Sequence, residues 1–346
     1  MKTLIKVYLI IFVLSSFFII GCDDENLHSL SDIIYIRNDK ADMPAYIHGN
    51  GSNQVFIVLL HGGPGGNGLE YRLGKYAEDL EKDFAMVYWD QRGQGMAQSN
   101  GSKSLINIEQ LAEDLEKLLL ILKDRYGQEA QLVLMGHSWG GTLGTYFLLE
   151  EKRQQLVDGW IEVDGAHDII KLSKESLLMI DSLGTNQVNL DKSVNEWQAL
   201  IDWSNSISSD SVKHFTGKIN QKSWEAIALL EDDEVINTPA YTSLEELRPV
   251  SLITSYFSGA ATSNLLFDEI EKTEMTDQLY KINIPCLFLW GKYDIVVPPQ
   301  LAKDAFELVS SDVKFLHYFE KSGHSPMSTE PGLYVEKVKE FIKAIP

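Results

Sequence analysis

A serine placed between glycines is the residue of this sequence best suited to nucleophilic chemistry. Ser138 lies in the pentapeptide GHSWG at 136–140, which has the G-x-S-x-G pattern. The apolar run 132–135 precedes it and the mainly apolar run 141–149 follows it, which predicts a strand, a sharp turn and a helix. Glycines on both sides let the strand and the helix approach each other, and the turn exposes the serine hydroxyl. An ordinary glycine-rich turn is the alternative, but this context favours Ser138 as a nucleophile.

A second glycine-rich segment is suited to stabilising the negative charge that forms when a serine attacks a carbonyl group. The apolar run 55–60 predicts a buried strand, and it leads directly into the sequence HGGPGG at 61–66. Acyl transfer needs two donors at the oxyanion, one after the nucleophile and one from a loop after an earlier strand. We predict the backbone N–H groups of Gly63 and Trp139 as these donors. A phosphate-binding loop is the alternative, but the segment lacks the G-K-[ST] ending of such loops.

A serine nucleophile also needs a general base and an acid, in the expected chain order Ser, Asp or Glu, His. The apolar run 284–290 predicts a buried strand, which is followed by Asp294. The run 313–319 predicts a last strand, which is followed by His324 in a loop with a neighbouring glycine. We therefore predict a triad in which Ser138 attacks, His324 transfers the proton and Asp294 orients the imidazole.

Other carboxylates are candidates for the acid. Glu162 and Asp164 lie at the end of the strand predicted around 160–163, and a strand end one position earlier in the sheet could present a carboxylate to His324. Asp304 and Asp312 fall in a predicted helix and at a strand entrance, and we expect both to be solvated. His317 lies inside a predicted strand and is expected to be a packed or surface histidine.

Together with the sequence WDQRGQG at 89–95, these motifs resemble the prolyl aminopeptidase (proline iminopeptidase) branch of the α/β-hydrolases. The motifs that carry the likeness are HGGPGG, DQRGxG, GxSWGG, GKYD at 291–294 and GHS at 323–325. The likeness covers residues from about 43 to 343 and is weakest in the middle. It implies an α/β-hydrolase core, a helical cap inserted after the sixth strand, and release of an N-terminal residue, proline or similar, from short peptides. We expect no metal and no other cofactor.

The resemblance also implies how the substrate is recognised. Carboxylates on the cap of this family hold the free α-amino group, and one of them belongs to a tryptophan–glutamate pair that Trp224 and Glu225 resemble. We therefore predict both residues as substrate-binding. A second family glutamate precedes an aromatic pair that 256–257 matches, but the segment 251–255 contains no carboxylate. A solvated position on a helix face is the alternative for Glu225.

Length and composition fit one catalytic domain with an insertion. The chain has 346 residues, of which 44% are hydrophobic, so it can bury a substantial core. Alternating strand and helix patterns predict an α/β fold with a mostly parallel sheet covered on both faces. The predicted core has two parts, 43–167 and 283–346, separated by a helical cap at 168–282. Residues 22–42 are predicted to form a tether and a first strand region.

One predicted helix begins with a capping pattern. Asn107 suits the N-cap, and Gln110 suits the third helical position of a capping box. Leucines at helical spacing follow and are predicted to be core residues: Leu111, Leu115, Leu118 and Leu122.

The net charge is −20, from 30 basic and 50 acidic residues. Such an acidic surface disfavours nucleic acid and anionic lipid as partners, because no basic stripe offsets the repulsion. It mildly favours cationic substrates, such as short peptides with a free amino terminus.

The N-terminus has the pattern of an export signal. A basic start is followed by an apolar run at 7–20, which is short for a transmembrane helix and predicts a signal peptide at 1–21. The sequence IIGC at 19–22 resembles the bacterial lipobox, which implies lipidation of Cys22 and anchoring of the exported protein to a bacterial membrane. An ordinary secretory signal is the alternative. The other cysteine, Cys286, lies in a predicted buried strand, so a disulfide partner for Cys22 is not expected.

Three function classes follow from these features. The first is a serine aminopeptidase acting on short peptides, and the second is a carboxylesterase or acyl-ester or lactone hydrolase on the same scaffold. The third is a non-catalytic binding protein, which the predicted triad and oxyanion loop disfavour. An epoxide hydrolase or dehalogenase is also disfavoured, because the elbow carries serine rather than aspartate.

Overall fold

A computed structural model describes residues 27–99, 101–208, 212, 217–240 and 247–346. The predicted signal peptide at 1–21 and the predicted lipidation site Cys22 lie outside the described residues. Within the described ranges, no helix is both long enough and apolar enough to cross a bilayer. Cys286 is buried and carries a free thiol.

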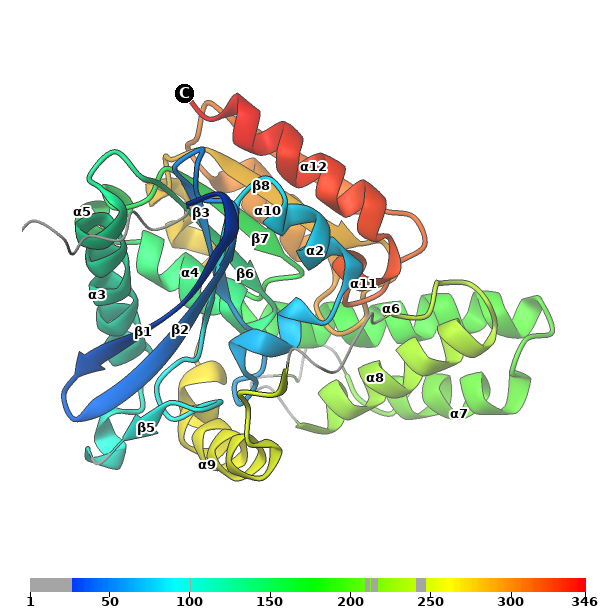
Figure 1. The fold of residues 1–346 in the computed structure, drawn as a ribbon. Coiled ribbons are helices and arrows are strands. Elements are labelled where there is room, and N and C mark those ends of the chain that lie inside the picture. The colour runs from blue at the N-terminus through cyan, green and yellow to red at the C-terminus, as the bar shows by residue number, and fades with distance from the viewer. Residues whose placement is uncertain (1–26, 100, 209–211, 213–216, 241–246) are drawn as a thin grey trace, which may run out of the picture.

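A nine-stranded sheet forms the centre of the molecule (Figure 1). Its main path runs β1-β2-β4-β3-β6-β7-β8-β9, and the short β5 pairs with β2. The strands are β1 Leu30–Asn38, β2 Ala41–Gly49, β3 Val55–Leu60, β4 Ala85–Trp89, β5 Gln98–Ser99, β6 Gln131–His137, β7 Gly159–Val163, β8 Cys286–Gly291 and β9 Lys314–Phe319. Pairing is antiparallel in β1-β2, β2-β4 and β2-β5, and parallel from β4 to β9. The predicted mostly parallel α/β sheet is confirmed.

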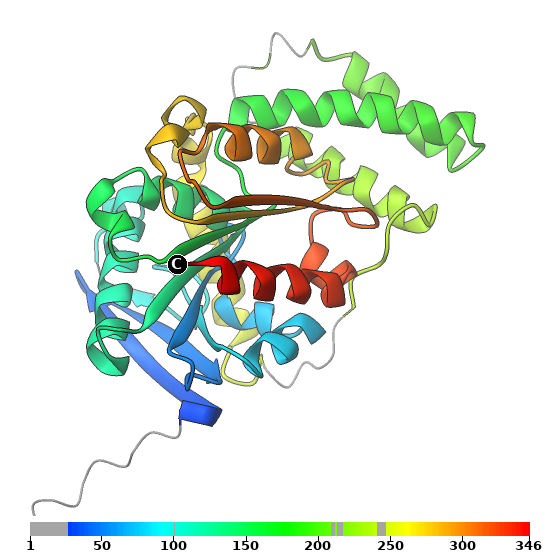
Figure 2. The same ribbon diagram turned by 90° about the horizontal axis from the view of Figure 1, so that it is seen from above.

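Helices cover both faces of the sheet, as the view from above shows (Figure 2). The helices of the core are α2 Lys75–Glu81, α3 Ile108–Tyr126, α4 Trp139–Leu148, α5 Glu151–Gln154, α10 Pro299–Leu308, α11 Pro326–Thr329 and α12 Pro331–Ala344. Short 3₁₀ helices are η2 Leu27–Ser29, η3 Gly68–Arg72, η4 Lys103–Leu105 and η7 Thr276–Lys281. Alternate residues of β3 point to opposite faces: Phe56 and Val58 pack in the cluster with α3 and α4, whereas Ile57 and Leu59 pack in the cluster with α2 and α12. The continuous apolar run of β3 is therefore explained by burial on both sides.

The segment between β7 and β8 is helical where the structure describes it. It contains α6 Ile169–Asn189, α7 Val194–Asn205, α8 Gly217–Asp232 and α9 Leu252–Ile270. Figure 1 shows α6, α7 and α8 together at one side of the core, whereas α9 lies apart from them. Because β7 is the sixth strand of the main path in chain order, the position is the one expected for the cap. We propose that these helices form that cap, and its boundaries at 168 and 282 stay predictions.

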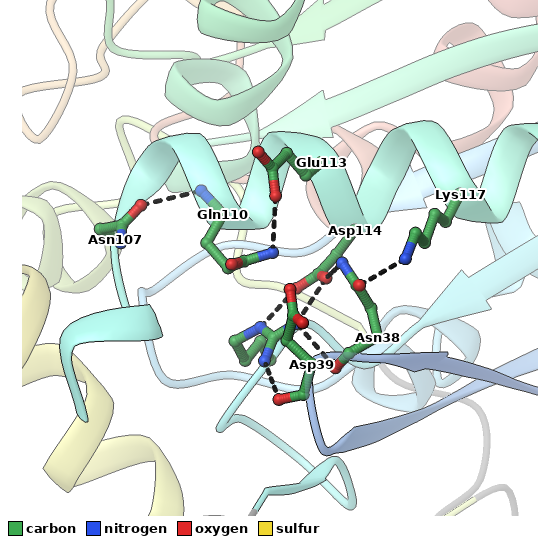
Figure 3. A network of polar contacts seen from close by, with 8 residues as sticks. Asn38, Asp39, Asn107, Gln110, Glu113, Asp114 and Lys117 are labelled. Atoms are coloured by element: carbon green, nitrogen blue, oxygen red, sulfur yellow. Dashed lines mark hydrogen bonds and ion pairs between the residues drawn. The ribbon is translucent and has the colours of Figure 1, made fainter. Parts of the chain in front are cut away.

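A buried ion pair fastens the segment after β4 to the rest of the core (Figure 3). Arg92 and Asp114 are both fully buried, and the guanidinium donates from Nε and Nη2 to the two carboxylate oxygens at 2.6 Å. The Asn38 side chain at the end of β1 also donates to Asp114, at 2.7 Å. Because a buried charge is stable only when it is paired and hydrogen-bonded, this network fixes the loop 89–95 against α3 and β1.

The capping box predicted at the start of α3 is only half formed (Figure 3). The Asn107 side chain accepts from the backbone N–H of Gln110 at 2.8 Å, as an N-cap residue should. The Gln110 side chain, however, donates to the Glu113 carboxylate at 2.9 Å instead of reaching back to Asn107. Among the described residues no hydrogen bond runs from the Asn107 N–H to the Gln110 side-chain oxygen, so the reciprocal half of the predicted capping box is not formed.

Candidate active site

Ser138 lies on a strained turn between β6 and α4. Its backbone has φ 55° and ψ −117°, a conformation that residues with a side chain rarely adopt. The turn is fixed by a hydrogen bond from the Ser138 N–H to the Val163 carbonyl at 3.0 Å. A Cβ atom on Gly140 would lie 1.9 Å from the Leu60 carbonyl oxygen, so only glycine permits this approach of α4 to β3. The predicted strand, turn and helix are therefore present around a half-buried serine.

Ser138 opens onto a cavity of about 320 Å³. The residues predicted as oxyanion donors, Gly63 and Trp139, line the same cavity. The remaining described lining residues are Pro64, Thr142, Ala166, Ile169, Leu172, Gly217, Asn220, Ser263, Phe267, Ile270, Val296 and Val297. Oxyanion stabilisation requires two donors beside the nucleophile, and the role of these two backbone N–H groups stays a prediction.

Gln91 connects these two loops, and it was not singled out as a site residue in the sequence. Its side-chain oxygen accepts from the Trp139 indole N–H at 2.9 Å, and its side-chain nitrogen donates to the His61 carbonyl at 3.1 Å. Nearby, the Gln94 side chain accepts from the backbone N–H of Gly65 at 2.5 Å. The glutamines of the DQRGQG motif therefore support the glycine-rich loop. The motif itself is the only sequence signal for them, because side-chain partners are not visible in a sequence.

The helix α9 supports the same loops from the cap side. The Thr262 hydroxyl donates to the Gly93 carbonyl at 2.5 Å, and the Ser263 hydroxyl donates to the Pro64 carbonyl. Because Ser263 also lines the cavity with Ser138, α9 forms part of the cavity wall as well as a support for its loops.

His324 and Asp294 meet at the ends of the last two strands. The His324 Nδ1 atom lies 2.8 Å from Asp294 Oδ2, and both side chains are buried. The other carboxylate oxygen of Asp294 accepts from the backbone N–H groups of Val296 and Val297 at 2.8 and 2.9 Å. A Cβ atom on Gly291 would lie 1.8 Å from the Gly323 carbonyl oxygen, so the close approach of the two loops depends on that glycine. An aspartate held by several donors fixes the orientation of the imidazole.

Within the described residues, no hydrogen bond joins the Ser138 hydroxyl to His324. The His324 ring is contacted by the rings of His137 and Trp224, with centroids at 4.9 and 5.4 Å. Catalytic hydrogen bonds are often long in free enzymes and shorten when substrate binds. The triad as a catalytic unit therefore stays a prediction, whereas the His324–Asp294 pair is a feature of the structure.

The alternative acids Asp164 and Glu162 are buried behind this pair. Asp164 accepts from the backbone N–H of Gly291 at 2.9 Å, and burial together with the nearby Asp294 charge raises its pKa well above the usual range. Burial also raises the pKa of Glu162 to about 8. Burial therefore favours the neutral, protonated form of both side chains, whereas the carboxylate that is hydrogen-bonded to His324 is that of Asp294.

One expectation about solvated carboxylates is wrong. Asp304 is buried rather than solvated, because it forms an ion pair with Lys171 and accepts from the Gln300 side chain at 2.9 Å. Asp312 is exposed, and His317 is partly buried within β9.

His137, Asp164 and His324 place possible metal-ligand atoms within 4.8 Å of one another. Hydrogen bonds already occupy both ring nitrogens of His137 and the Nδ1 atom of His324. These bonds explain the grouping as a polar network of the site.

The two residues predicted to bind substrate lie on α8 in different surroundings. Trp224 is half-exposed and packs edge-on against His324, so α8 lies over the histidine. Glu225 does not line the described cavity: its carboxylate pairs with Lys222 and accepts from the Gln221 side chain at 3.0 Å. The structure therefore brings Trp224 to the site and leaves Glu225 in an ion pair on the helix surface.

Comparison with known proteins defines the class. The chain belongs to the alpha/beta hydrolase fold family, which it matches over residues 55–331. It is 28% identical to a proline iminopeptidase of Saccharolobus solfataricus over 297 residues, 85% of this chain and 86% of the relative. It is 25% identical to the probable aminopeptidase YbaC of Bacillus subtilis over 316 residues, 86% of this chain and 92% of the relative. The crystal structure of VinJ matches with a TM-score of 0.62 at 18% identity, over 91% of this chain and 99% of that one.

These similarities confirm the α/β-hydrolase fold and the resemblance to the prolyl aminopeptidase branch. The protein is an enzyme, a serine hydrolase of this fold.

Proposed function

We propose that this enzyme is an aminopeptidase that removes the N-terminal residue, proline or similar, from short peptides. The observation that carries the proposal is its likeness to a proline iminopeptidase over 85% of the chain, because a match of that length includes the cap region as well as the core. The contact between Trp224 on α8 and His324 supports it, since it places a cap helix over the histidine.

In the proposed reaction, the Ser138 hydroxyl attacks the carbonyl carbon of the first residue and gives its proton to His324. Asp294 stabilises the imidazolium, and the N–H groups of Gly63 and Trp139 stabilise the oxyanion. His324 then protonates the departing amine, which leaves an acyl-enzyme on Ser138. A water molecule, activated by His324, hydrolyses this ester and releases the amino acid.

Recognition of the free ammonium group is assigned to Glu225 in this proposal. The residue follows Trp224, which contacts His324, and it would exchange its ion pair with Lys222 for the substrate ammonium. A charge-assisted hydrogen bond of this kind contributes roughly 1.5–3 kcal/mol, or about ten- to a hundredfold in kcat/KM.

An ester hydrolase is the second candidate, and the composition of the cavity favours it. The described lining residues of the Ser138 cavity include no charged side chain. An ammonium group that enters such a site loses hydration without gaining a counter-charge, whereas the acyl chain of an ester does not carry this cost. A short-chain carboxylester or a lactone would therefore fit the cavity.

One substrate panel separates the two candidates. The detergent-solubilised full chain is assayed with prolyl and alanyl 4-nitroanilides, with their N-acetylated forms, and with 4-nitrophenyl acetate and butyrate. An aminopeptidase cleaves the free-amino anilides and loses activity on the N-acetylated ones. Hydrolysis of the esters without cleavage of any anilide would instead establish the ester hydrolase.

Glu225→Gln tests the recognition step, with Glu231→Gln on the same helix as its matched control. The expected result is a loss of kcat/KM on free-amino anilides alone. Equal losses on anilides and esters would show that Glu225 has a structural role.

We also propose that the protein is exported and anchored to a bacterial membrane through lipid on Cys22. The support is the lipobox-like sequence at 19–22 and the burial of Cys286, the other cysteine. Labelling with a fatty-acid analogue and partitioning into detergent should both be lost in Cys22→Ser. Wild-type protein that takes up no label would contradict the anchor.

A further inference from the structure

His137, the residue directly before the candidate nucleophile, has both ring nitrogens engaged. Its Nδ1 atom lies 2.7 Å from the Tyr71 hydroxyl, and its Nε2 atom lies 2.8 Å from the carbonyl oxygen of His324. Because a carbonyl oxygen can only accept, Nε2 carries the proton and donates it. The Nδ1 atom is then an acceptor, so the Tyr71 hydroxyl donates to it.

The Tyr71 hydroxyl has a second partner in the glycine-rich loop. It accepts from the backbone N–H of Gly62 at 2.8 Å while it donates to His137. The hydrogen bonds therefore form one directed chain, from Gly62 through Tyr71 and His137 to the His324 backbone. Each end of this chain lies at a site residue or next to one, since Gly62 precedes Gly63 and the other end is the backbone carbonyl of His324. Within the chain, His137 directly precedes Ser138.

The imidazole of His137 is suited to a fixed role and not to proton transfer. The side chain is buried, and burial together with the nearby His324 lowers its pKa to about 3. The ring is therefore neutral near pH 7, and it keeps one donor and one acceptor. A buried network in which every member is satisfied has a single stable arrangement.

We propose that Tyr71 and His137 are positioning residues that hold the glycine-rich loop, the serine turn and the His324 loop in register with one another. This inference depends on the proposed roles of Ser138 and His324 as nucleophile and base. Its consequence is kinetic, because displacement of reacting groups by about 1 Å costs about a hundredfold in rate.

The two bonds of His137 can be removed separately. The amide of asparagine is placed like Nδ1 of histidine, so His137→Asn keeps an acceptor for Tyr71 and loses the link to His324. The amide of glutamine is placed like Nε2, so His137→Gln keeps the link to His324 and loses the acceptor. Tyr71→Phe removes a single oxygen atom and leaves the bond between His137 and His324.

The readout is the rate at which a fluorophosphonate probe modifies Ser138 in the full chain. This reaction needs an activated serine and does not depend on whether the natural substrate is a peptide or an ester. The unfolding midpoint of each variant is measured alongside. It distinguishes slower labelling caused by unfolding from slower labelling caused by displaced site residues. Tyr126→Phe is the matched control, because its hydroxyl is bonded to Asp32 at 3.0 Å, outside this hydrogen-bond chain.

The expected result is a loss of about tenfold or more in labelling rate for Tyr71→Phe, with the Tyr126→Phe rate unchanged. In the His137→Gln background, which already lacks the acceptor, adding Tyr71→Phe should cost less than in the wild type, because it removes only the remaining bond from the Gly62 N–H and residues that act as one unit are not additive. In the His137→Asn background it should still cost as much as in the wild type, because asparagine keeps an acceptor for the Tyr71 hydroxyl and the two changes then act independently.

Two results would overturn the inference in different ways. Equal labelling rates for Tyr71→Phe and Tyr126→Phe, or the same loss in every background, would disprove the positioning role of Tyr71 and His137 and leave the proposed function intact. A wild-type protein that is not labelled on Ser138 would disprove both the role of Ser138 as nucleophile and the positioning role of Tyr71 and His137. If neither His137 variant folds, the comparison of Tyr71→Phe with Tyr126→Phe decides alone.

Discussion

The Trp139 indole donates to the side-chain oxygen of Gln91 at 2.9 Å, so the residue after the candidate nucleophile is held by the loop after β4. The same carboxamide donates to the carbonyl of His61, where the glycine-rich loop begins. One side chain therefore sets the spacing between the loops that carry the two predicted oxyanion donors. The buried ion pair between Arg92 and Asp114 fastens this loop to α3.

Gln91→Met should lower kcat more than it raises KM. The methionine side chain has a similar length but makes neither hydrogen bond, and each lost bond is worth about 0.5–1.5 kcal/mol. Steady-state kinetics on the best substrate of the panel measures the effect. The control is Gln110→Met on α3, a buried glutamine whose side chain is bonded to Glu113. A similar kcat for both variants would show that Gln91 serves the fold alone.

Ser138→Ala should abolish hydrolysis while the fold persists. Loss of one member of a working triad lowers turnover by about 10⁴- to 10⁶-fold, and His324→Ala should be nearly as damaging because the two residues act as a unit. Turnover and circular dichroism of each variant check this prediction. Substantial activity in Ser138→Ala would move the nucleophile elsewhere.

Asp294→Asn and Asp164→Asn should differ sharply. The Asp294 carboxylate is bonded to His324, and its amide holds the wrong tautomer of the imidazole, which costs about 10⁴-fold in kcat. Burial and the nearby Asp294 charge raise the pKa of Asp164 and favour its neutral form, so a neutral amide of the same shape should change turnover little. Kinetics of both variants at pH 7 decide. Greater damage from Asp164→Asn would assign the acid to the end of β7.

Glu162→Gln should change how stability depends on pH. Burial raises the pKa of Glu162 from 4.5 to about 8, so the folded state binds more protons than the unfolded state between these values. Stability due to this group is complete below about pH 4.5 and falls as the pH rises toward 8, by up to about 1.4 kcal/mol per pH unit.

Urea unfolding at pH 5 and pH 7.5 measures this effect. The Glu162→Gln protein should gain stability relative to the wild type as the pH rises, with little change in turnover. Glu151→Gln, on an exposed position of α5, should follow the wild type. Parallel pH dependence of Glu162→Gln and the wild type would contradict the buried, protonated state.

Asp114→Ala should be strongly destabilising. It leaves the buried guanidinium of Arg92 without a counter-charge, which costs about 3–5 kcal/mol. The matched control is Asp42→Ala, which breaks the exposed pair with Arg37 and should leave the unfolding midpoint unchanged. Denaturant unfolding of both variants checks the contrast. Similar small effects would show that solvent or another group compensates the charge of Arg92.

Several strands of the core could be predicted closely, because the runs that form β3, β6, β7 and β8 are short, mainly apolar and buried along almost their whole length. The run 55–60 coincides with β3. The strand predicted from 284 begins instead at Cys286, since Pro285 has no N–H for the ladder. The N-terminal hairpin was less clear: β2 crosses the boundary predicted between 42 and 43, after a turn in which Asp39 and Lys40 have positive φ.

Contacts between distant segments could not be predicted. The bonds of Gln91 to Trp139, and of Tyr71 to His137, join residues that are 48 and 66 positions apart. No periodicity in the sequence encodes such partners, which arise from the geometry of the assembled loops. The position of Glu225 is a related case. Adjacent residues on a helix point in different directions, and of these two residues it is Trp224 that has a ring contact with His324.

The bonds from Thr262 and Ser263 to the loops at Gly93 and Pro64 limit how the insertion can be exchanged between relatives. In the sequence α9 lies within the insertion, but its hydrogen bonds connect it to two loops of the catalytic core. A chimera that replaces the whole segment 168–282 would remove the outer support of both loops. Grafts confined to α6, α7 and α8 would retain it. Ser251 is the N-cap of α9. Exchanges of the insertion that end before this residue are therefore best suited to changing the substrate specificity of this enzyme.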